Sequence, residues 1–292
     1  MKKFIKNILF FVSGLMIYFI IILVINLVNI SRISPEINSS RTLILGDSHT
    51  AHALNPDIFK SAQNLSQGAE PYIVTYWKLQ KVLNDIDPDT VIIGFNHYNI
   101  SGINDLKFSD ERWSNTMFKR SFLIEDFNSI KDKIQIDYFT YYKFIFRDLC
   151  LFPHKDHIHY IGKYKVANQS YVSNSKERIL RHYYVNNINE AEISLINLSY
   201  LDSIIEMCFK RDIVPVLVET PVHSSYYKDI PSKHKSYYES LCVRWKANNK
   251  VIIIRGNSLK FDNTRFLDSD HLSPLGSTYF TKYVINFLDN NE

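Results

Sequence analysis

Cysteine is scarce in this sequence, and its scarcity limits how the chain can be stabilised. There are only three cysteines in 292 residues, Cys150, Cys208 and Cys242, and their spacing matches no metal-binding pattern. An odd number excludes a framework in which every cysteine is paired, although a single Cys208–Cys242 bridge stays open. We expect buried free thiols instead. A hydrophobic core must then hold the domain together, and the 46% hydrophobic content is sufficient for one.

An excess of charge of one sign is also missing. The 34 Lys and Arg residues are interspersed with 30 Asp and Glu residues, the formal net charge is +4, and there is no basic block. This pattern argues against a nucleic-acid partner. A histidine-rich segment at 154–159 has the residue types of a metal site, but its charged, loop-like composition favours a solvated basic segment. We expect no metal and no cofactor.

One long run without charge lies near the N-terminus. Residues 7–30 are largely apolar and separate the lysines of residues 1–6 from Arg32. As a helix rising 1.5 Å per residue, this run can span about 30 Å of hydrocarbon, and it is longer than the apolar part of a cleaved signal peptide. We predict an uncleaved, single-pass anchor in the cytoplasmic (inner) membrane. The preceding lysines keep residues 1–6 in the cytoplasm, so the remaining chain is expected outside it.

After a polar linker at 31–40, short apolar runs alternate with helical patterns through a domain at 41–292. The runs are rich in β-branched residues, which predicts buried strands. Pro215 weakens one of them, because proline lacks an amide donor. The predicted strands are 41–46, 90–95, 213–218 and 251–254, and the predicted helices are 74–83, 191–209, 236–247 and 274–288. This alternation predicts a three-layer α/β/α sandwich around a parallel sheet of about five strands.

The first motif that could carry chemistry is Gly46-Asp47-Ser48-His49, directly after the first predicted strand. The carboxyl ends of parallel strands form the edge where such folds bind ligands. If Ser48 begins the next helix, the free amides there stabilise negative charge that develops beside its hydroxyl. A serine hydroxyl is a weak nucleophile and needs a positioned base.

The second motif, Asp268-Ser-Asp270-His271, supplies a candidate base near the C-terminus. Asp268 and His271 are three residues apart, so a turn can bring them to the same side. A carboxylate there fixes the imidazole tautomer and stabilises the imidazolium that forms during attack. We predict Ser48 as nucleophile, His271 as base and Asp268 as the orienting carboxylate, with Asp270 as the alternative.

Together, the two motifs resemble the first and last blocks of SGNH/GDSL hydrolases. The resemblance extends from residue 41 to the C-terminus, apart from most of 103–189, and implies a flavodoxin-like sheet with a Ser-His-Asp triad. It also implies an oxyanion hole formed by the Ser48 amide, Gly68 and Asn96. His97 stands where the family pattern G-x-N-D has aspartate. His97 or Asn99 therefore remains an alternative at the oxyanion position.

The stretch 103–189 interrupts the α/β alternation and is far longer than an ordinary connection. It is rich in Tyr, Phe, Lys and His, and we predict a mostly helical insertion or cap beside the Ser48 cleft. Some of its tyrosines would be available to stack on a sugar: Tyr138, Tyr141, Tyr142 and Tyr160. Three histidines near the strand ends are further candidates for substrate contact: His49, His97 and His223.

The resemblance implies a serine esterase or O-acyltransferase that acts on ester groups, with acetyl the expected acyl group. Anchored proteins of this layout resemble those that acylate cell-surface polysaccharides. The expected partners are an acylated glycan or small ester, the membrane, and a membrane protein that donates acyl groups. The alternative is a non-catalytic SGNH-fold binding or assembly protein in polysaccharide export.

Overall fold

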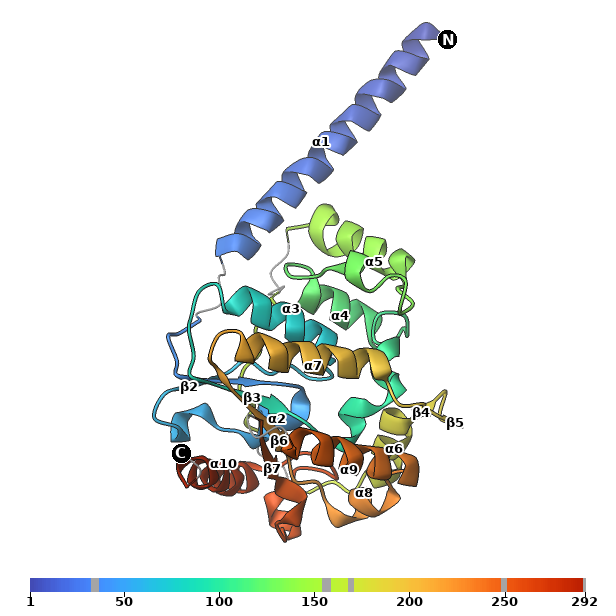
Figure 1. Cartoon of the computed structure of the whole chain (residues 1–292). Coiled ribbons are helices and arrows are strands. Elements are labelled where there is room, and N and C mark those ends of the chain that lie inside the picture. The colour runs from blue at the N-terminus through green and yellow to red at the C-terminus, as the bar shows by residue number, and fades with distance from the viewer. Residues whose placement is uncertain (33–36, 154–158, 168–170, 248–250, 291–292) are drawn as a thin grey trace.

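The computed structural model describes residues 1–32, 37–153, 159–167, 171–247 and 251–290 (Figure 1). Its centre is a five-stranded parallel sheet with the strand order β2-β1-β3-β6-β7. The strands are β1 (Thr42–Leu45), β2 (Ala62–Asn64), β3 (Thr90–Gly94), β6 (Val214–Glu219) and β7 (Ile252–Arg255). Helices cover both faces, so the predicted α/β fold with a parallel sheet of about five strands is confirmed.

Alternating strand residues pack into two separate cores. Leu43 and Leu45 of β1 face a core shared with α3 (Tyr72–Val82), α7 (Leu195–Phe209) and α9 (Ser232–Lys246). Ile44 faces the other core, which contains side chains of α2 (Ser48–Ala53) and α10 (Pro274–Asp289). Both faces are covered, which explains why these strands are continuous apolar runs in the sequence.

Two strands differ from the sequence expectation for physical reasons. β2, with the sequence Ala-Gln-Asn, is short and has no apolar pattern, so it was not predicted. Pro215 lies within β6, which pairs with β3 on one side and β7 on the other. Pairing with β7 begins only at Val216, and the amide of Val214 bonds to Asp89 on the β3 side. The missing proline donor therefore faces the β7 side, before that ladder begins.

The segment between β3 and α7 is built mainly of short helices. It includes η2 (His97–Ile100), η3 (Gly102–Leu106), α4 (Ser114–Ser121), η4 (Phe127–Ser129), α5 (Tyr138–Phe144), the π-helical η5 (Ile145–Leu151) and α6 (Ser175–Tyr183). A small hairpin, β4 (Tyr184–Val185) and β5 (Asn189–Glu190), follows α6. The remaining short elements are η1 (Pro56–Ile58), α8 (Ser224–Asp229), η6 (Gly256–Ser258) and η7 (Asn263–Arg265).

The N-terminal helix α1 (Lys2–Arg32) is long and apolar enough to cross a membrane, and its first part projects away from the domain (Figure 1). Its second half packs against η5. The side chain of Asn26 donates hydrogen bonds to the carbonyls of Leu149 and Phe152, and Phe19 meets Phe146 edge-on. The helix is therefore attached to the domain through residues 146–152. The cysteines are free thiols, with Cys208 and Cys242 buried.

Candidate active site

The turn between β1 and α2 fixes the position of Ser48. Gly46 has φ +147°, and a side chain there would meet Thr50 Oγ1 at 2.5 Å, so only glycine fits comfortably. Asp47 is the N-cap of α2, and its carboxylate accepts a hydrogen bond from the His49 amide at 2.7 Å. Ser48 is thus the first residue of α2. Its amide, at a helix start, has no acceptor within the helix.

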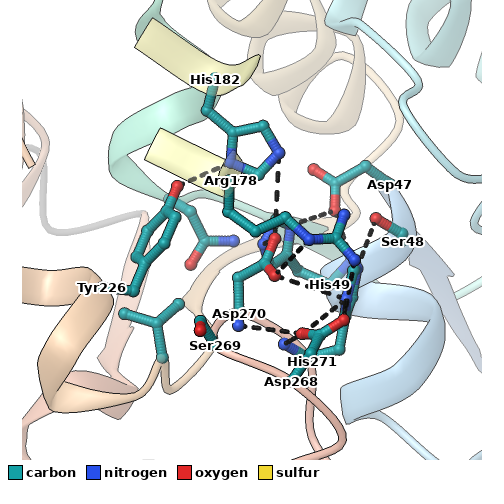
Figure 2. Close-up of polar contacts among 12 residues, drawn as sticks. Asp47, Ser48, His49, Arg178, His182, Tyr226, Asp268, Ser269, Asp270 and His271 are labelled. Atoms are coloured by element: carbon teal, nitrogen blue, oxygen red, sulfur yellow. Dashed lines mark hydrogen bonds and ion pairs between the residues drawn. The ribbon is translucent and has the colours of Figure 1, made fainter. Parts of the chain in front are cut away.

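The three residues predicted as nucleophile, base and orienting carboxylate lie together (Figure 2). Ser48 Oγ is 2.8 Å from His271 Nε2, and His271 Nδ1 is 3.0 Å from each oxygen of Asp268. These contacts assign the Nδ1–H tautomer, in which the ring donates to Asp268 and accepts from Ser48. Asp268 also accepts hydrogen bonds from the amides of Asp270 and His271. The loop therefore holds the carboxylate in one orientation.

Arg178 of α6 contacts both aspartates of this loop. Its guanidinium donates to Asp268 Oδ2 at 2.7 Å and forms an ion pair with Asp270 Oδ1 at 3.2 Å. Asp270 Oδ1 is 3.6 Å from His271 Nδ1, farther than the Asp268 oxygens. Asp268 is thus the closer partner of His271, and Asp270 takes part in a second group of charges.

His49 is the centre of that second group. Its ring is buried, with Nδ1 3.2 Å from Asp47 Oδ1 and Nε2 3.1 Å from Asp270 Oδ2. Burial alone lowers the pKa of His49, but the hydrogen bonds and charges of Asp270 and Asp47 outweigh it and raise the pKa to about 9. At neutral pH His49 is an imidazolium between two carboxylates. Its ring stacks on His271 with centroids 4.9 Å apart.

Both carboxylates beside His49 stay ionised. Burial raises the pKa of Asp47, but hydrogen bonds from His49 and from Asn99 Nδ2 (2.7 Å) more than offset it, so the pKa lies below its usual value. Burial likewise opposes ionisation of Asp270, yet the neighbouring His271 and His49 hold its pKa well below the usual range. A network of alternating charges, from Asp47 through His49, Asp270 and Arg178 to Asp268, therefore supports His271.

Ser48 and His271 open into a pocket of about 360 Å³. Gly68 borders it close to Ser48, because a side chain added at Gly68 would lie 3.8 Å from Ser48 Cβ. The Gly68 carbonyl accepts a hydrogen bond from Arg120, and its amide has no acceptor among the described residues. The remaining lining comes largely from the segment after β3: Tyr98, Lys107, Arg112, Trp113, Thr116, Arg120, Arg178, Arg181 and His182.

Several residues predicted to contact substrate do not line this pocket. Asn96 and His97 border a separate small cavity that His49 also lines, and the side-chain oxygen Oδ1 of Asn96 accepts a hydrogen bond from the Thr220 amide. The alternative, Asn99, is buried and bonded to Asp47. Asn96 Nδ2 is buried and has no hydrogen-bond partner among the described residues. Because none of the three residues belongs to the lining of the Ser48 pocket, an oxyanion donor from η2 or its N-cap stays a prediction.

The two other histidines predicted to contact substrate lie outside the lining of this pocket. His49 is enclosed by carboxylates and acts behind the pocket rather than in it. His223 caps α8 and contacts Ser225 and Asn263 through its two ring nitrogens, so both are already engaged. Substrate contact by either residue therefore stays a prediction.

The four tyrosines proposed for sugar stacking lie elsewhere. α5 turns its aromatic side toward α4 and η4, where Tyr141 meets Phe118 and bonds to Glu125. Tyr138 and Tyr142 are exposed on α5, and Tyr160 is buried in the core. The aromatic residues that do line the pocket are Trp113 and Tyr98. Neither was predicted, because the segment after β3 has no regular hydrophobic pattern.

Two clusters have the residue types of a cation site: His49, His182 and Asp270, and Asp268, Asp270 and His271. In the structure their carboxylates already contact positive groups of the protein itself, Arg178 and the imidazolium of His49. Of the histidine-rich segment weighed as a metal cluster, His154, Asp156 and His157 lie outside the described residues.

The fold and this site define an α/β protein with a Ser–His–Asp arrangement at the carboxyl edge of a parallel sheet. No protein-family profile and no curated protein sequence matches the chain. Among solved structures, it is similar to a GDSL-like lipase from Bacteroides thetaiotaomicron, at 10% identity and TM-score 0.43, covering 91% of this chain and 96% of that one.

Two further similar structures have comparable scores. One is a lipase/acylhydrolase from Enterococcus faecalis, at 12% identity and TM-score 0.41, covering 86% of this chain and 96% of that one. The other is a family two carbohydrate esterase from Clostridium thermocellum, at 9% identity and TM-score 0.39, covering 88% and 65% of the respective chains.

Proposed function

We propose that the chain is a serine esterase or O-acyltransferase of the SGNH type, with Ser48 as its nucleophile. The observation that carries this proposal is the 2.8 Å contact between Ser48 Oγ and His271 Nε2, together with the 3.0 Å contacts between His271 Nδ1 and Asp268. A hydroxyl, a base and an orienting carboxylate in hydrogen-bond contact are the parts required for acyl transfer.

The reaction follows from these contacts. Ser48 Oγ attacks the ester carbonyl and transfers its proton to His271 Nε2, while Asp268 stabilises the imidazolium. We assign the amides of Ser48 and Gly68 as donors to the oxyanion. When the tetrahedral intermediate collapses, the alcohol leaves with the proton from His271, and the acyl group stays on Ser48. Water then releases the acid, or a second hydroxyl accepts the acyl group, by the reverse sequence of proton transfers.

In this proposal the acyl group is acetyl and the substrate is a cell-surface glycan, by the resemblance to anchored SGNH proteins. A membrane protein that supplies acyl groups is the corresponding partner. Transfer and hydrolysis differ only in the second nucleophile. Incubating the protein with an activated acetyl ester, with and without acceptor glycan, distinguishes them: transfer acetylates the glycan, whereas hydrolysis yields acetate at the same rate in both mixtures.

Labelling with a fluorophosphonate tests the proposal directly. We expect covalent modification of Ser48, identified by peptide mass spectrometry, because the reagent requires a serine activated by a base. His271→Ala should lose the label. A non-catalytic SGNH-fold binding protein, the alternative from the sequence, would leave Ser48 unmodified under the same conditions.

The two aspartates of the C-terminal motif should give different phenotypes. Asp268→Asn should lower turnover on the order of a hundredfold or more, because an amide no longer stabilises the imidazolium of His271. Asp270→Asn removes a carboxylate from His49 and should mainly reduce the temperature of thermal unfolding. The measurements are kcat on an activated ester and the unfolding midpoint. Equal losses of kcat in both variants would contradict the assignment of Asp268.

We also propose that α1 anchors the protein in the cytoplasmic membrane with the domain outside the cytoplasm. The length and apolar composition of α1 and the lysines before its apolar part support this topology. The full-length protein should sediment with membranes, and protease added to spheroplasts should digest its C-terminus. A C-terminus protected in intact spheroplasts and digested only after lysis would contradict the orientation.

A further inference from the structure

The Ser48 pocket is strongly cationic. Five basic side chains line it, and the described lining residues include no Asp or Glu. Three of the five already have partners in the protein: Arg112 pairs with Asp110, Arg120 donates to the Gly68 carbonyl, and Arg178 holds Asp268 and Asp270. The other two, Lys107 and Arg181, form no ion pair with a carboxylate among the described residues.

Lys107 is the more unusual of these two. Its side chain lies in the wall of the pocket with only 3% of the residue exposed, and its ammonium is 3.6 Å from the centre of the Trp113 ring. No hydrogen-bond acceptor for this ammonium occurs among the described residues. Burial, together with the charge of Arg181, lowers the pKa of Lys107 to about 7. Lys107 belongs to the pocket lining, so a ligand in the pocket can supply the acceptor that the protein does not.

Arg181 contacts the same tryptophan. Its guanidinium carbon is 4.4 Å from the centre of the Trp113 ring, and the residue is half-buried at the pocket. Contact with the ring restricts the orientation of the guanidinium and leaves its N–H groups available to a carboxylate or phosphate group of a ligand. Lys107 and Arg181, both in contact with Trp113, thus place two basic groups in the lining of the pocket that also contains Ser48.

We propose that this pocket takes esters that carry a carboxylate or phosphate group, bound by Lys107 and Arg181 beside Trp113. The inference extends the proposed function and rests on it in one respect: only the proposed reaction of Ser48 identifies the ligand as an ester. The two cations supply charge-assisted hydrogen bonds, and guanidinium matches both anions because its paired donors bind two oxygens at once. Arg178 does not compete for the ligand, because the aspartates of the C-terminal motif already hold it.

Binding to the full-length Ser48→Ala protein in detergent tests this inference without turnover. The probes are O-acetylated glucuronic acid, O-acetylated glucose 6-phosphate and O-acetylated glucose, measured by calorimetry. We expect at least one anionic probe to bind tenfold or more tightly than the neutral sugar, with a preference that weakens as salt is added. The two anionic arms distinguish a carboxylate ligand from a phosphate ligand. Equal affinity for all three probes would overturn the inference.

Three substitutions in the Ser48→Ala background locate the site. Lys107→Met keeps the packing on Trp113, and Arg181 is less buried than Lys107, so at least one of Lys107→Met and Arg181→Gln should fold. Each substitution should reduce the preference for the anionic probes several-fold. The control is Arg244→Gln, because Arg244 also stacks on a tryptophan, 4.7 Å from the Trp245 ring centre, but lies on α9 and does not line the pocket. An anionic preference that survives in a folded Lys107→Met or Arg181→Gln variant would also overturn the inference.

These experiments distinguish a failure of the substrate inference from a failure of the proposed catalytic function. If fluorophosphonate labels Ser48 in the wild type but the anionic probes bind no better than the neutral one, only the substrate inference fails. If the anionic preference is found and depends on Lys107 and Arg181, but Ser48 is never labelled, only the catalytic proposal fails.

Discussion

Ser48→Ala is expected to abolish turnover of an activated ester while leaving the fold intact. Among the described residues, the side chain of Ser48 forms one hydrogen bond, to His271, and alanine preserves the first turn of α2. His271→Ala should lower kcat on the order of a thousandfold or more, because no other described group lies at the same position to take the serine proton. The double variant should be scarcely worse than either single variant, since the two residues act as a unit.

Ser203→Ala is the matched control for this experiment. Ser203 is a helical serine of α7 whose hydroxyl donates to the Ser199 carbonyl, and it does not line the pocket. It should retain wild-type kcat and the wild-type unfolding midpoint. Full activity in a folded His271→Ala variant, or losses that simply multiply in the double variant, would contradict the assigned roles.

The second large effect concerns stability and arises from His49. His49→Ala leaves the carboxylates of Asp47 and Asp270 buried without the cation between them, and breaking a buried ion pair typically costs about 3–5 kcal/mol. We therefore expect a large fall in the free energy of unfolding at pH 7, measured by denaturant titration of the full-length protein. His223→Ala is the control, because the His223 ring nitrogens bond to the neutral side chains of Ser225 and Asn263, and His223 forms no ion pair with any described residue.

His49 also makes the stability of the folded protein depend on pH in the alkaline range. The pKa of His49 is raised in the folded protein to about 9, whereas an unfolded histidine titrates near 6.5. The stabilisation is therefore complete below about pH 6.5 and is lost as pH rises through about 9, with a total of roughly 3 kcal/mol. Wild type should lose stability between pH 7 and 10, and His49→Ala should lose less. An identical decline in both proteins would contradict a charged His49.

Acid should destabilise the protein through the other members of the network. The pKa values of Asp47 and Asp270 are lowered in the folded state. Their contribution to the free energy of unfolding is fully present at pH values above the usual pKa of aspartate. It is lost as the pH falls through the lower pKa values of the folded state. The stability curve should consequently decline on both sides, with His49 responsible for the alkaline side.

Features that depend on neighbouring residues were predictable. The strands of the sheet appear as β-branched runs because burial on both faces requires continuous apolar residues, and only the short polar β2 lacks this signal. Asp268 and His271 are three residues apart, so the turn that holds them is encoded locally. Ser48 follows a strand and a tight glycine turn, which fixes its place at the sheet edge whatever the rest of the chain does.

Other features depend on neighbours from distant parts of the chain, which a sequence pattern does not reveal. The sequence places His49 beside the nucleophile, which suggested substrate contact, but its partner Asp270 is 221 residues away and turns it into a buried cation. Asn96 was assigned through the resemblance of Gly94-Phe95-Asn96 to the G-x-N-D block, and in the structure it borders the inner cavity. The aromatic content of 103–189 was evident, yet which ring faces Ser48 depends on how α4 and α6 pack.

The parallel α/β fold, the apolar N-terminal helix and the proximity of Asp268 to His271 could thus be predicted from the amino-acid sequence, because periodicity and short spacing act within one element. The 2.8 Å contact of His271 with Ser48, the charge on His49 and the basic pocket lining around Trp113 could be seen only in the folded chain. These depend on burial and on distances between residues far apart in the chain. A charge or a contact of that kind exists only once packing has excluded water and brought the groups together.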